Sequence, residues 1–223
     1  MGIHAYDELY LPGAQNILGH AVDFAVMTLE IEPKVFDGTL RVSKTAKQFA
    51  QGNPRYVAGM NGCELAREIL DEVQLSYPDV PDAMYLDKSP EYWAGWALAY
   101  YQWLTDRPFK EILRAVSLEK IIDMYPVYHE MDIEKFVEQM HRLMKEAFPY
   151  TKLREHRDNC GMSQAELAAE SDVPLRQIQL FEQGHRDINK TAAITLHKLA
   201  KALCCRMEDL LEPEYENGIC GKK

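Results

Sequence analysis

The segment GMSQAELAAESDVPLRQIQLFEQG, residues 161–184, decides how the carboxyl-terminal part of the chain folds. Ser163 and Glu166 have the spacing of a capping box, in which each side chain bonds a backbone N–H that the first turn of a helix leaves unpaired. Gly184 suits the position just beyond a helix, because glycine adopts positive φ without a steric penalty. We therefore predict one helix over 163–170, a second over about 174–183, and a tight turn at 171–173 between them.

The shortness of this turn constrains how the two helices pack. So few connecting residues make the helices cross steeply, an arrangement that can present the second helix to a groove of duplex DNA. Apolar residues at helical spacing extend the pattern to five helices over residues about 148–212. The same spacing predicts a core that includes Val173, Ile178, Phe181 and Leu199.

Three segments of this region carry a resemblance to a known family. They are R-x-x-x-G-M-S-Q-A-E-L-A from Arg157, V-P-L-R-Q-I-Q-L-F-E-Q-G from Val173, and L-A-K-A-L-C-C-R-M-E-D-L-L from Leu199. The region resembles the lambda-repressor-like helix-turn-helix family, the Cro-type or XRE class. The resemblance implies a five-helix domain that binds double-stranded DNA in a sequence-specific way, commonly as a homodimer.

The resemblance also assigns roles to residues at matching positions. Arginine can form two hydrogen bonds with guanine, and glutamine can do the same with adenine, in the major groove. Contacts to phosphates position a protein on DNA without specifying a sequence. By resemblance, the base-contacting residues are Leu175, Arg176 and Gln179, the phosphate-contacting candidates are Gln164, Gln177, Gln183, Arg186 and Lys190, and a structural ion pair joins Arg157 to Glu182.

The sequence departs from the family pattern at four positions. Asp172 stands where the family has the glycine of the turn, and Asp tolerates positive φ better than most residues do. Pro174 and Leu175 replace the small polar residues that usually begin helix three, and Leu175 can offer DNA only an apolar contact. Cys204 replaces the glycine expected after helix four.

Charge is distributed unevenly along the 223 residues. Residues 1–149 hold 14 Lys/Arg and 23 Asp/Glu, a balance of −9, whereas residues 150–206 hold 9 and 7, a balance of +2. Residues 207–223 hold 2 Lys/Arg and 5 Asp/Glu, a balance of −3, and the three balances sum to the net charge of −10. A weakly positive region in an acidic chain is compatible with DNA binding, but it predicts modest non-specific affinity because few counterions are released.

Other features of the sequence indicate a cytoplasmic protein. The amino-terminal residues, MGIHAYDELY, lack the basic and then apolar regions of a secretory signal. The most apolar stretch, residues 93–103, is too short to span a bilayer. Five cysteines form no CxxC pair, which fits a reducing compartment better than a disulfide framework.

Residues 1–147 show helical periodicity almost throughout, so the sequence predicts an all-α fold for the whole chain. Asn61 with Glu64, and Ser89 with Pro90, mark two strong helix starts. Trp93, Trp96, Tyr100 and Trp103 lie at helical spacing and are expected in the core. The expected helices are 12–30, 43–51, 61–73, one that starts at Ser89-Pro90 and carries Trp93 to Trp103, and then 108–115, 117–124 and 131–147, with loops at 32–40 and 77–90.

The sequence contains no group of residues with the spacing of a known catalytic or metal-binding motif. His129 and His141 lack the four-residue spacing that places two histidines on one helix face. His20 and Asp23 can pair, but a histidine bonded at the edge of a helix is the simpler interpretation. The GNPRYVAGMNG segment lacks the Lys-Ser/Thr of a phosphate loop. We therefore expect no enzyme activity, no metal and no cofactor.

Three interpretations of residues 1–147 remain open. The first is an acidic helical domain that dimerises or senses a signal and so regulates DNA binding. The second is an antitoxin, in which this domain binds and neutralises a toxin while residues 148–212 repress the operon. The third is a catalytic domain attached to a DNA-binding domain. Residues 213–223 are expected to form a flexible tail.

Overall fold

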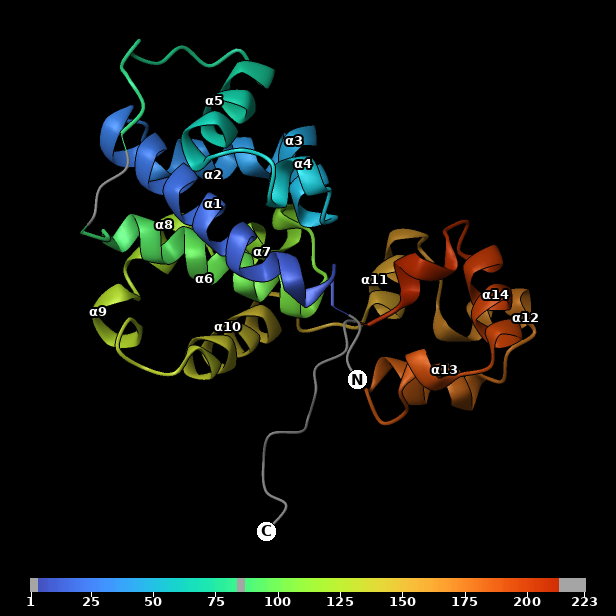
Figure 1. The fold of residues 1–223 in the computed structure, drawn as a ribbon. Coiled ribbons are helices and arrows are strands. Elements are labelled where there is room, and N and C mark those ends of the chain that lie inside the picture. The colour runs from blue at the N-terminus through green and yellow to red at the C-terminus, as the bar shows by residue number, and fades with distance from the viewer. Residues whose placement is uncertain (1–3, 84–86, 213–223) are drawn as a thin grey trace. The chain divides into compact units, whose positions relative to one another are not determined.

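The computed structural model describes residues 4–83 and 87–212, and every regular element within these ranges is helical (Figure 1). The all-α prediction is therefore confirmed. The chain divides into two compact units, which we call the amino-terminal unit, within Met1–Ala147, and the carboxyl-terminal unit, within Phe148–Pro213. The tail expected at 213–223 lies outside the described residues.

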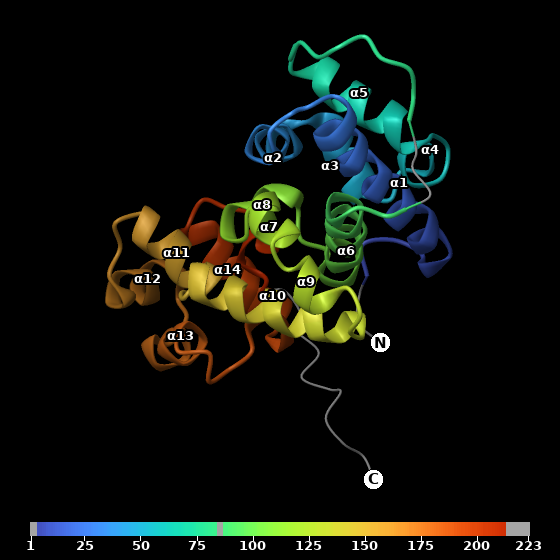
Figure 2. The ribbon, with the colours of Figure 1, turned by 90° about the vertical axis from the view of Figure 1, so that its left-hand side faces the viewer.

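The amino-terminal unit is built around two long helices, α1 (Leu11–Asp23) and α6 (Pro90–Thr105), which lie side by side (Figures 1 and 2). Glycines allow their close approach. A Cβ atom on Gly95 would lie 2.5 Å from the carbonyl oxygen of Leu18, and a Cβ on Gly19 would lie 2.8 Å from the ring of Tyr92. The two backbones can pack at this distance only because both positions lack a side chain.

The remaining elements surround this helix pair. The π-helical turn Phe24–Thr28 continues α1. Both predicted helix starts are confirmed, because Asn61 and Glu64 form a capping box at the start of α5 and Ser89 caps α6. These elements are η1 (Glu8–Tyr10), η2 (Phe24–Thr28), α2 (Pro33–Val42), α3 (Lys44–Ala50), α4 (Pro54–Val57), α5 (Gly62–Glu72), α7 (Phe109–Ala115), α8 (Leu118–Ile122), α9 (Tyr125–Tyr128) and α10 (Ile133–Ala147).

The loop predicted at residues 32–40 is wrong, because these residues form most of α2. Pro33 occupies the first helical turn, where its missing N–H costs nothing. Phe36 and Leu40, one turn apart, are buried in the core. The backbone N–H of Leu118, at the start of α8, donates to the buried carboxylate of Asp37 at 2.8 Å. Tertiary burial therefore outweighs the loop-forming tendency of the prolyl and glycyl residues in this segment.

Of the four aromatic residues of α6 that the sequence predicts in the core, only Trp103 is buried. Trp93, Trp96 and Tyr100 are half-buried, and the ring of Trp93 packs edge-on against Phe136 of α10 with centroids 5.4 Å apart. The close approach of α1 leaves room mainly for small residues on that face. The buried residues of α6 accordingly include the small residues Ala94, Gly95, Ala97 and Ala99, and larger side chains are buried with them at Tyr92, Leu98 and Tyr101.

The carboxyl-terminal unit is a separate cluster of short helices with its own core. The four residues predicted as core are all buried, together with Leu153, Leu167, Ile188, Ala200, Leu203 and Leu210. Each of these residues belongs to this unit. Its elements are α11 (Lys152–Asn159), α12 (Gln164–Ser171), α13 (Leu175–Glu182), η3 (Ile188–Lys190), α14 (Ala193–Ala202) and η4 (Met207–Leu210).

Within residues 4–83 and 87–212, no helix combines the length and the apolar character that crossing a membrane requires.

Candidate nucleic-acid interface

The start of α12 has the geometry that the sequence predicts. Ser163 Oγ accepts from the backbone N–H of Glu166 at 3.2 Å, and the Glu166 carboxylate accepts from the N–H of Ser163 at 2.7 Å. This capping box makes Ser163 the cap, so α12 itself begins one residue later than predicted, at Gln164. The side chain of Gln164 is thereby placed at the amino-terminal end of a helix, where backbone N–H groups attract anions.

The turn between α12 and α13 depends on Asp172, which has φ of 51° in the left-handed region. Lys198 of α14 donates to the Asp172 carboxylate at 2.7 Å, which holds this exposed residue against the unit. The hydrogen bond and the charge of Lys198 lower the pKa of Asp172. Cys204 likewise has φ of 51°, so both residues that replace family glycines adopt the conformation for which glycine is usual.

The next helix, α13, is one residue shorter at each end than predicted. Pro174 has an extended backbone, with φ of −54° and ψ of 131°, and therefore precedes the helix as its cap residue. Gln183 is the cap at the other end, and Gly184 follows with φ of 68°. The prediction of helix, turn and helix is correct, and only the end residues differ.

Two faces of α13 have opposite character. Ile178 and Phe181 are buried and attach the helix to the core. On the other side of the helix, Arg176 and Gln183 are exposed and Gln179 is half-buried. These three residues share one face, because residues three and four apart are neighbours on a helix surface. Among the described residues, no acidic group pairs with the guanidinium of Arg176. This face therefore offers one unpaired cation and two carboxamides.

The other proposed DNA contacts differ in how available their side chains are. Leu175 is 39% exposed, and Gln177 is half-buried. Lys190 Nζ lies 3.2 Å from the Asp187 carboxylate, so part of its charge is compensated within the unit. The Arg186 guanidinium carbon lies 5.7 Å from the centroid of the Phe181 ring, and the residue remains exposed. Arg186 is thus a more available cation than Lys190.

A bonded cluster joins α11, α12 and α13. The Arg157 guanidinium donates to Glu182 through Nε at 2.6 Å and through a terminal nitrogen at 2.9 Å, and both side chains are largely buried. Arg157 also donates to the carbonyl of Met162 at 2.7 Å. The hydrogen bond to Glu182 is the main reason that the pKa of Arg157 is raised. The pair therefore has a structural position inside the unit.

Sequence reasoning did not anticipate that Gln164 belongs to this cluster. Its carboxamide Nε2 donates to Glu182 at 2.8 Å, so the side chain is oriented by the same carboxylate that binds Arg157. The salt bridge between Lys198 and Asp172 was also missed. Both contacts join residues on different helices, and neither has a local sequence signal.

The candidates for chemistry in the amino-terminal unit do not converge. His20 lies 3.2 Å from Lys88 Nζ, and Asp23 instead accepts from the hydroxyl of Ser89. His129 Nε2 lies 3.7 Å from the carboxylate of the neighbouring Glu130 on an exposed surface. In the part of the chain that the structure describes, no group of three or more His, Cys, Asp or Glu side chains is arranged to hold a metal ion.

Comparison with known proteins agrees with this geometry. Residues 153–210 match the helix-turn-helix family, and the region before them matches no family. Comparisons with curated proteins and with solved structures found no match for the chain. The predicted family resemblance is confirmed for this region: the carboxyl-terminal unit is a helix-turn-helix DNA-binding domain of the XRE type.

Proposed function

We propose that this chain is a sequence-specific transcriptional regulator that inserts α13 into the major groove of DNA. The observation that carries the proposal is the outward face of α13. Arg176 is exposed on this face, and no carboxylate among the described residues forms an ion pair with it. Gln179 lies about one helical turn further on. These two side chains are suited to guanine and adenine respectively. Leu175 adds an apolar contact of the kind that a thymine methyl group accepts.

Phosphate contacts would hold the helix in register. Gln164, Gln177, Gln183, Arg186 and Lys190 are the proposed contacts, and three of the five are neutral amides. Such contacts orient a protein without reading a sequence. With few cations to release bound counterions, specific base contacts must supply a large share of the discrimination. A homodimer would place two copies of α13 in half-sites about 34 Å apart, one helical turn of DNA.

The test is to measure operator binding by Arg176→Ala and Gln179→Ala. A site is first selected from random DNA with the full chain, and the affinities for it and for unrelated DNA are then compared. Each substitution should reduce the preference for the selected site by about 1–3 kcal/mol, the amount that a two-bond base contact supplies. Both residues lie outside the core, so the fold should survive.

Lys201→Ala is the matched control, because it removes an exposed cation from α14 rather than from α13. It should leave the preference for the selected site unchanged. If Arg176→Ala and Gln179→Ala both bind the selected site as tightly as the parent chain, α13 does not read DNA with this face and the proposal is wrong.

We further propose that the regulator controls the expression of its own gene, with an antitoxin as the alternative. The alternative is favoured by the balance of −9 over residues 1–149, since an acidic surface suits a basic toxin or a site that normally holds nucleic acid. Footprinting on the upstream region of the gene tests autoregulation. Co-expression with the product of the neighbouring gene tests the alternative: if that product is harmless without this chain, the antitoxin interpretation fails.

A further inference from the structure

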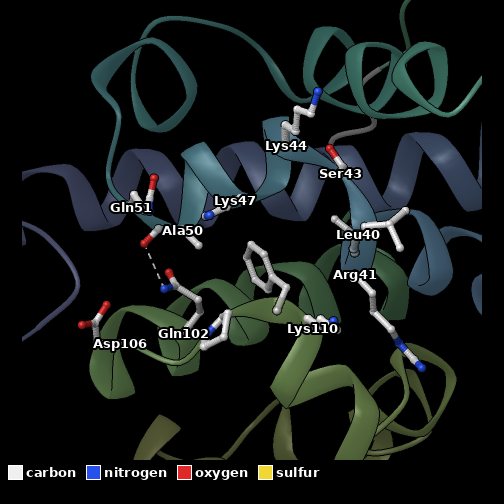
Figure 3. Close-up of a pocket in the computed structure, with 13 residues that line it drawn as sticks. Leu40, Arg41, Ser43, Lys44, Lys47, Ala50, Gln51, Gln102, Asp106 and Lys110 are labelled. Atoms are coloured by element: carbon white, nitrogen blue, oxygen red, sulfur yellow. Dashed lines mark hydrogen bonds between the residues drawn. The ribbon is translucent and has the colours of Figure 1, made fainter. Parts of the chain in front are cut away.

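The amino-terminal unit contains a hollow of about 450 Å³ between α3 and the α6–α7 junction, with the end of α2 beside it (Figure 3). This volume is within the range of small-molecule sites. All of the lining residues belong to the one unit. They are Leu40, Arg41, Val42, Ser43, Lys44, Lys47, Ala50, Gln51, Gln102, Asp106, Pro108, Phe109 and Lys110.

The charge of the lining is opposite to that of the unit. Among the described residues, the lining includes four cations, Arg41, Lys44, Lys47 and Lys110, and one acid, Asp106, a balance of +3. Lys47 lies on the α3 side and Lys110 on the α7 side in Figure 3, whereas the guanidinium of Arg41 extends away toward Asp37, 2.5 Å from its carboxylate. Among the described residues, no carboxylate pairs with the ammonium of Lys47 or of Lys110.

Basic side chains concentrated at one hollow need an explanation in a region whose balance is −9 over residues 1–149. Like charges that share a hollow repel one another, and a bound anion reduces that repulsion. An anion held between Lys47 and Lys110 would supply that counter-charge.

The wall of the hollow contains a buried acceptor to which no group in the described part of the chain donates a hydrogen bond. Gln102 is 1% exposed, and its Nε2 donates to the carbonyl oxygen of Ala50 at 3.0 Å (Figure 3). Its Oε1 is buried and has no hydrogen-bond partner within residues 4–83 and 87–212. Turning the carboxamide over would place Oε1 against the Ala50 oxygen, so the present orientation is the favourable one. A buried acceptor left without a donor destabilises a folded protein, because its hydration is lost and no hydrogen bond replaces it.

The rest of the surface is mainly apolar. Leu40, Ala50, Pro108 and Phe109 contribute carbon atoms to the walls. Ligand sites commonly combine apolar walls with a few polar groups that fix the orientation of the ligand. The hollow thus has three recognition elements: cations at its edge, apolar walls, and one unsatisfied acceptor.

We propose that this hollow binds a small organic anion that has an apolar body and a hydrogen-bond donor. The anionic group lies between Lys47 and Lys110, the apolar body fills the space beside Phe109, and the donor bonds Oε1 of Gln102. The proposal concerns the amino-terminal unit alone and does not depend on how the carboxyl-terminal unit binds DNA.

Three probes that differ in one group each test this assignment with the full-length chain by isothermal titration calorimetry. Anthranilate has a carboxylate, an aromatic ring and an amino donor. Benzoate lacks the donor, and 2-aminobenzamide lacks the charge. We expect saturable binding of one anthranilate per chain, weaker binding of benzoate, and the weakest binding of 2-aminobenzamide. Absence of saturable anthranilate binding, or equal binding of 2-aminobenzamide, overturns the proposal.

Variants then locate the site. The double variant Lys47→Gln/Lys110→Gln changes only exposed side chains and should weaken anthranilate binding about tenfold or more, the effect of losing about 1.4 kcal/mol. Lys120→Gln, an exposed lysine on α8 that does not line the hollow, is the matched control and should bind as the parent does. Equal binding by the double variant and the control places the ligand elsewhere and overturns the proposal.

A third variant tests the buried acceptor. Gln102→Met keeps the length of the side chain and removes its oxygen, so it should abolish the preference for anthranilate over benzoate. A folded variant that keeps this preference contradicts the role of Oε1. If the variant does not fold, the comparison of benzoate with anthranilate on the parent chain decides the question.

Discussion

Glu182 shows how one residue can connect a structural contact to a functional one. Its carboxylate accepts from the largely buried Arg157 and also from Gln164, the proposed phosphate contact at the start of α12. Removing one partner of a buried ion pair costs about 3–5 kcal/mol, because the other charge remains buried without compensation. The same carboxylate therefore stabilises the unit and orients a side chain at the proposed interface.

The role of Gln164 can be separated from that of the base-reading residues. Gln164→Ala should weaken binding to all DNA sequences alike, because a phosphate contact carries no sequence information. Competition assays with the selected site and with single-base variants of it measure this. A loss confined to one base position would contradict the phosphate role. The melting temperature of the variant shows whether loss of the bond to Glu182 also affects stability.

His141, in the middle of α10, makes the stability of the amino-terminal unit depend on pH. Burial, with a smaller contribution from the charge of Arg107, lowers the pKa of His141 to about 4. In the unfolded chain the pKa of histidine is about 6.5. Between these values the unfolded chain binds a proton that the folded unit excludes, so stability is lost as the pH falls from about 6.5 toward 4.

His141→Gln should reduce this dependence. The parent chain should lose more unfolding free energy than the variant when the pH is lowered from 7 to 5, whatever the difference between them at pH 7. Urea unfolding followed by tryptophan fluorescence measures this, because Trp93, Trp96 and Trp103 all belong to the amino-terminal unit. Parallel losses in the two proteins would show that His141 is not responsible.

At the scale of elements, the packing of neighbouring helices decides which local sequence preferences the structure adopts. The α1–α6 contact requires small residues at the crossing, where Gly95 meets the backbone of Leu18 and Gly19 meets the ring of Tyr92. Trp93 and Trp96 of α6 remain half-buried. The segment of residues 32–40 becomes a helix for a related reason, since Phe36 and Leu40 gain burial in the core. Local propensity is a weak preference that tertiary contacts commonly outweigh.

Gly95 tests the importance of the crossing. The Cβ of Gly95→Ala would meet a backbone oxygen at 2.5 Å, so the helices must move apart. We expect the substitution to lower the unfolding free energy by about 1–3 kcal/mol, as overpacking of a core does. Gly38→Ala is the control, because a Cβ at this position of α2 would meet no atom of the described residues within 4 Å, apart from its chain neighbours and the backbone of its own helix. It should raise the unfolding free energy by about 0.5–1 kcal/mol, since alanine favours a helix over glycine.

Tryptophan fluorescence reports both glycine variants, because Gly38 and Gly95 lie in the unit that contains the tryptophans. Stabilisation by both substitutions would mean that α1 and α6 do not approach closely at Gly95.

At the scale of the whole molecule, the two units have separate cores and different charge. Every residue of the core cluster around Phe181 comes from residues 153–210. The bonds that close the unit are also internal, since Asn189 and Glu212 exchange hydrogen bonds and the backbone N–H of Lys152 donates to Glu212 at 2.6 Å. A unit with its own core and its own closing contacts has what a domain needs to fold alone.

We therefore predict that a fragment of residues 148–213 folds without the amino-terminal unit. It should show a helical circular dichroism spectrum and one cooperative thermal transition. Because the fragment contains no tryptophan, circular dichroism is the appropriate probe. A fragment that remains unfolded under conditions in which the full chain is folded would show that the carboxyl-terminal unit depends on other parts of the chain.

The sequence by itself determined the helix-turn-helix. The capping box at Ser163, the left-handed position at Asp172 and the apolar spacing around Ile178 are recognisable because each depends on residues close together in the chain. Local hydrogen bonds and steric preferences act over one or two helical turns, so a local pattern is enough to specify them. The same reasoning located the caps of α5 and α6.

Only the tertiary structure decided which distant residues meet. The bond of Gln164 to Glu182 joins two helices, and the bond of Gln102 to Ala50 joins residues 52 positions apart. The gathering of Lys47 and Lys110 at one hollow likewise follows from the packing of α3 against α7. Long-range packing selects these contacts because burial free energy depends on the whole set of neighbours, and no spacing along the chain encodes that set.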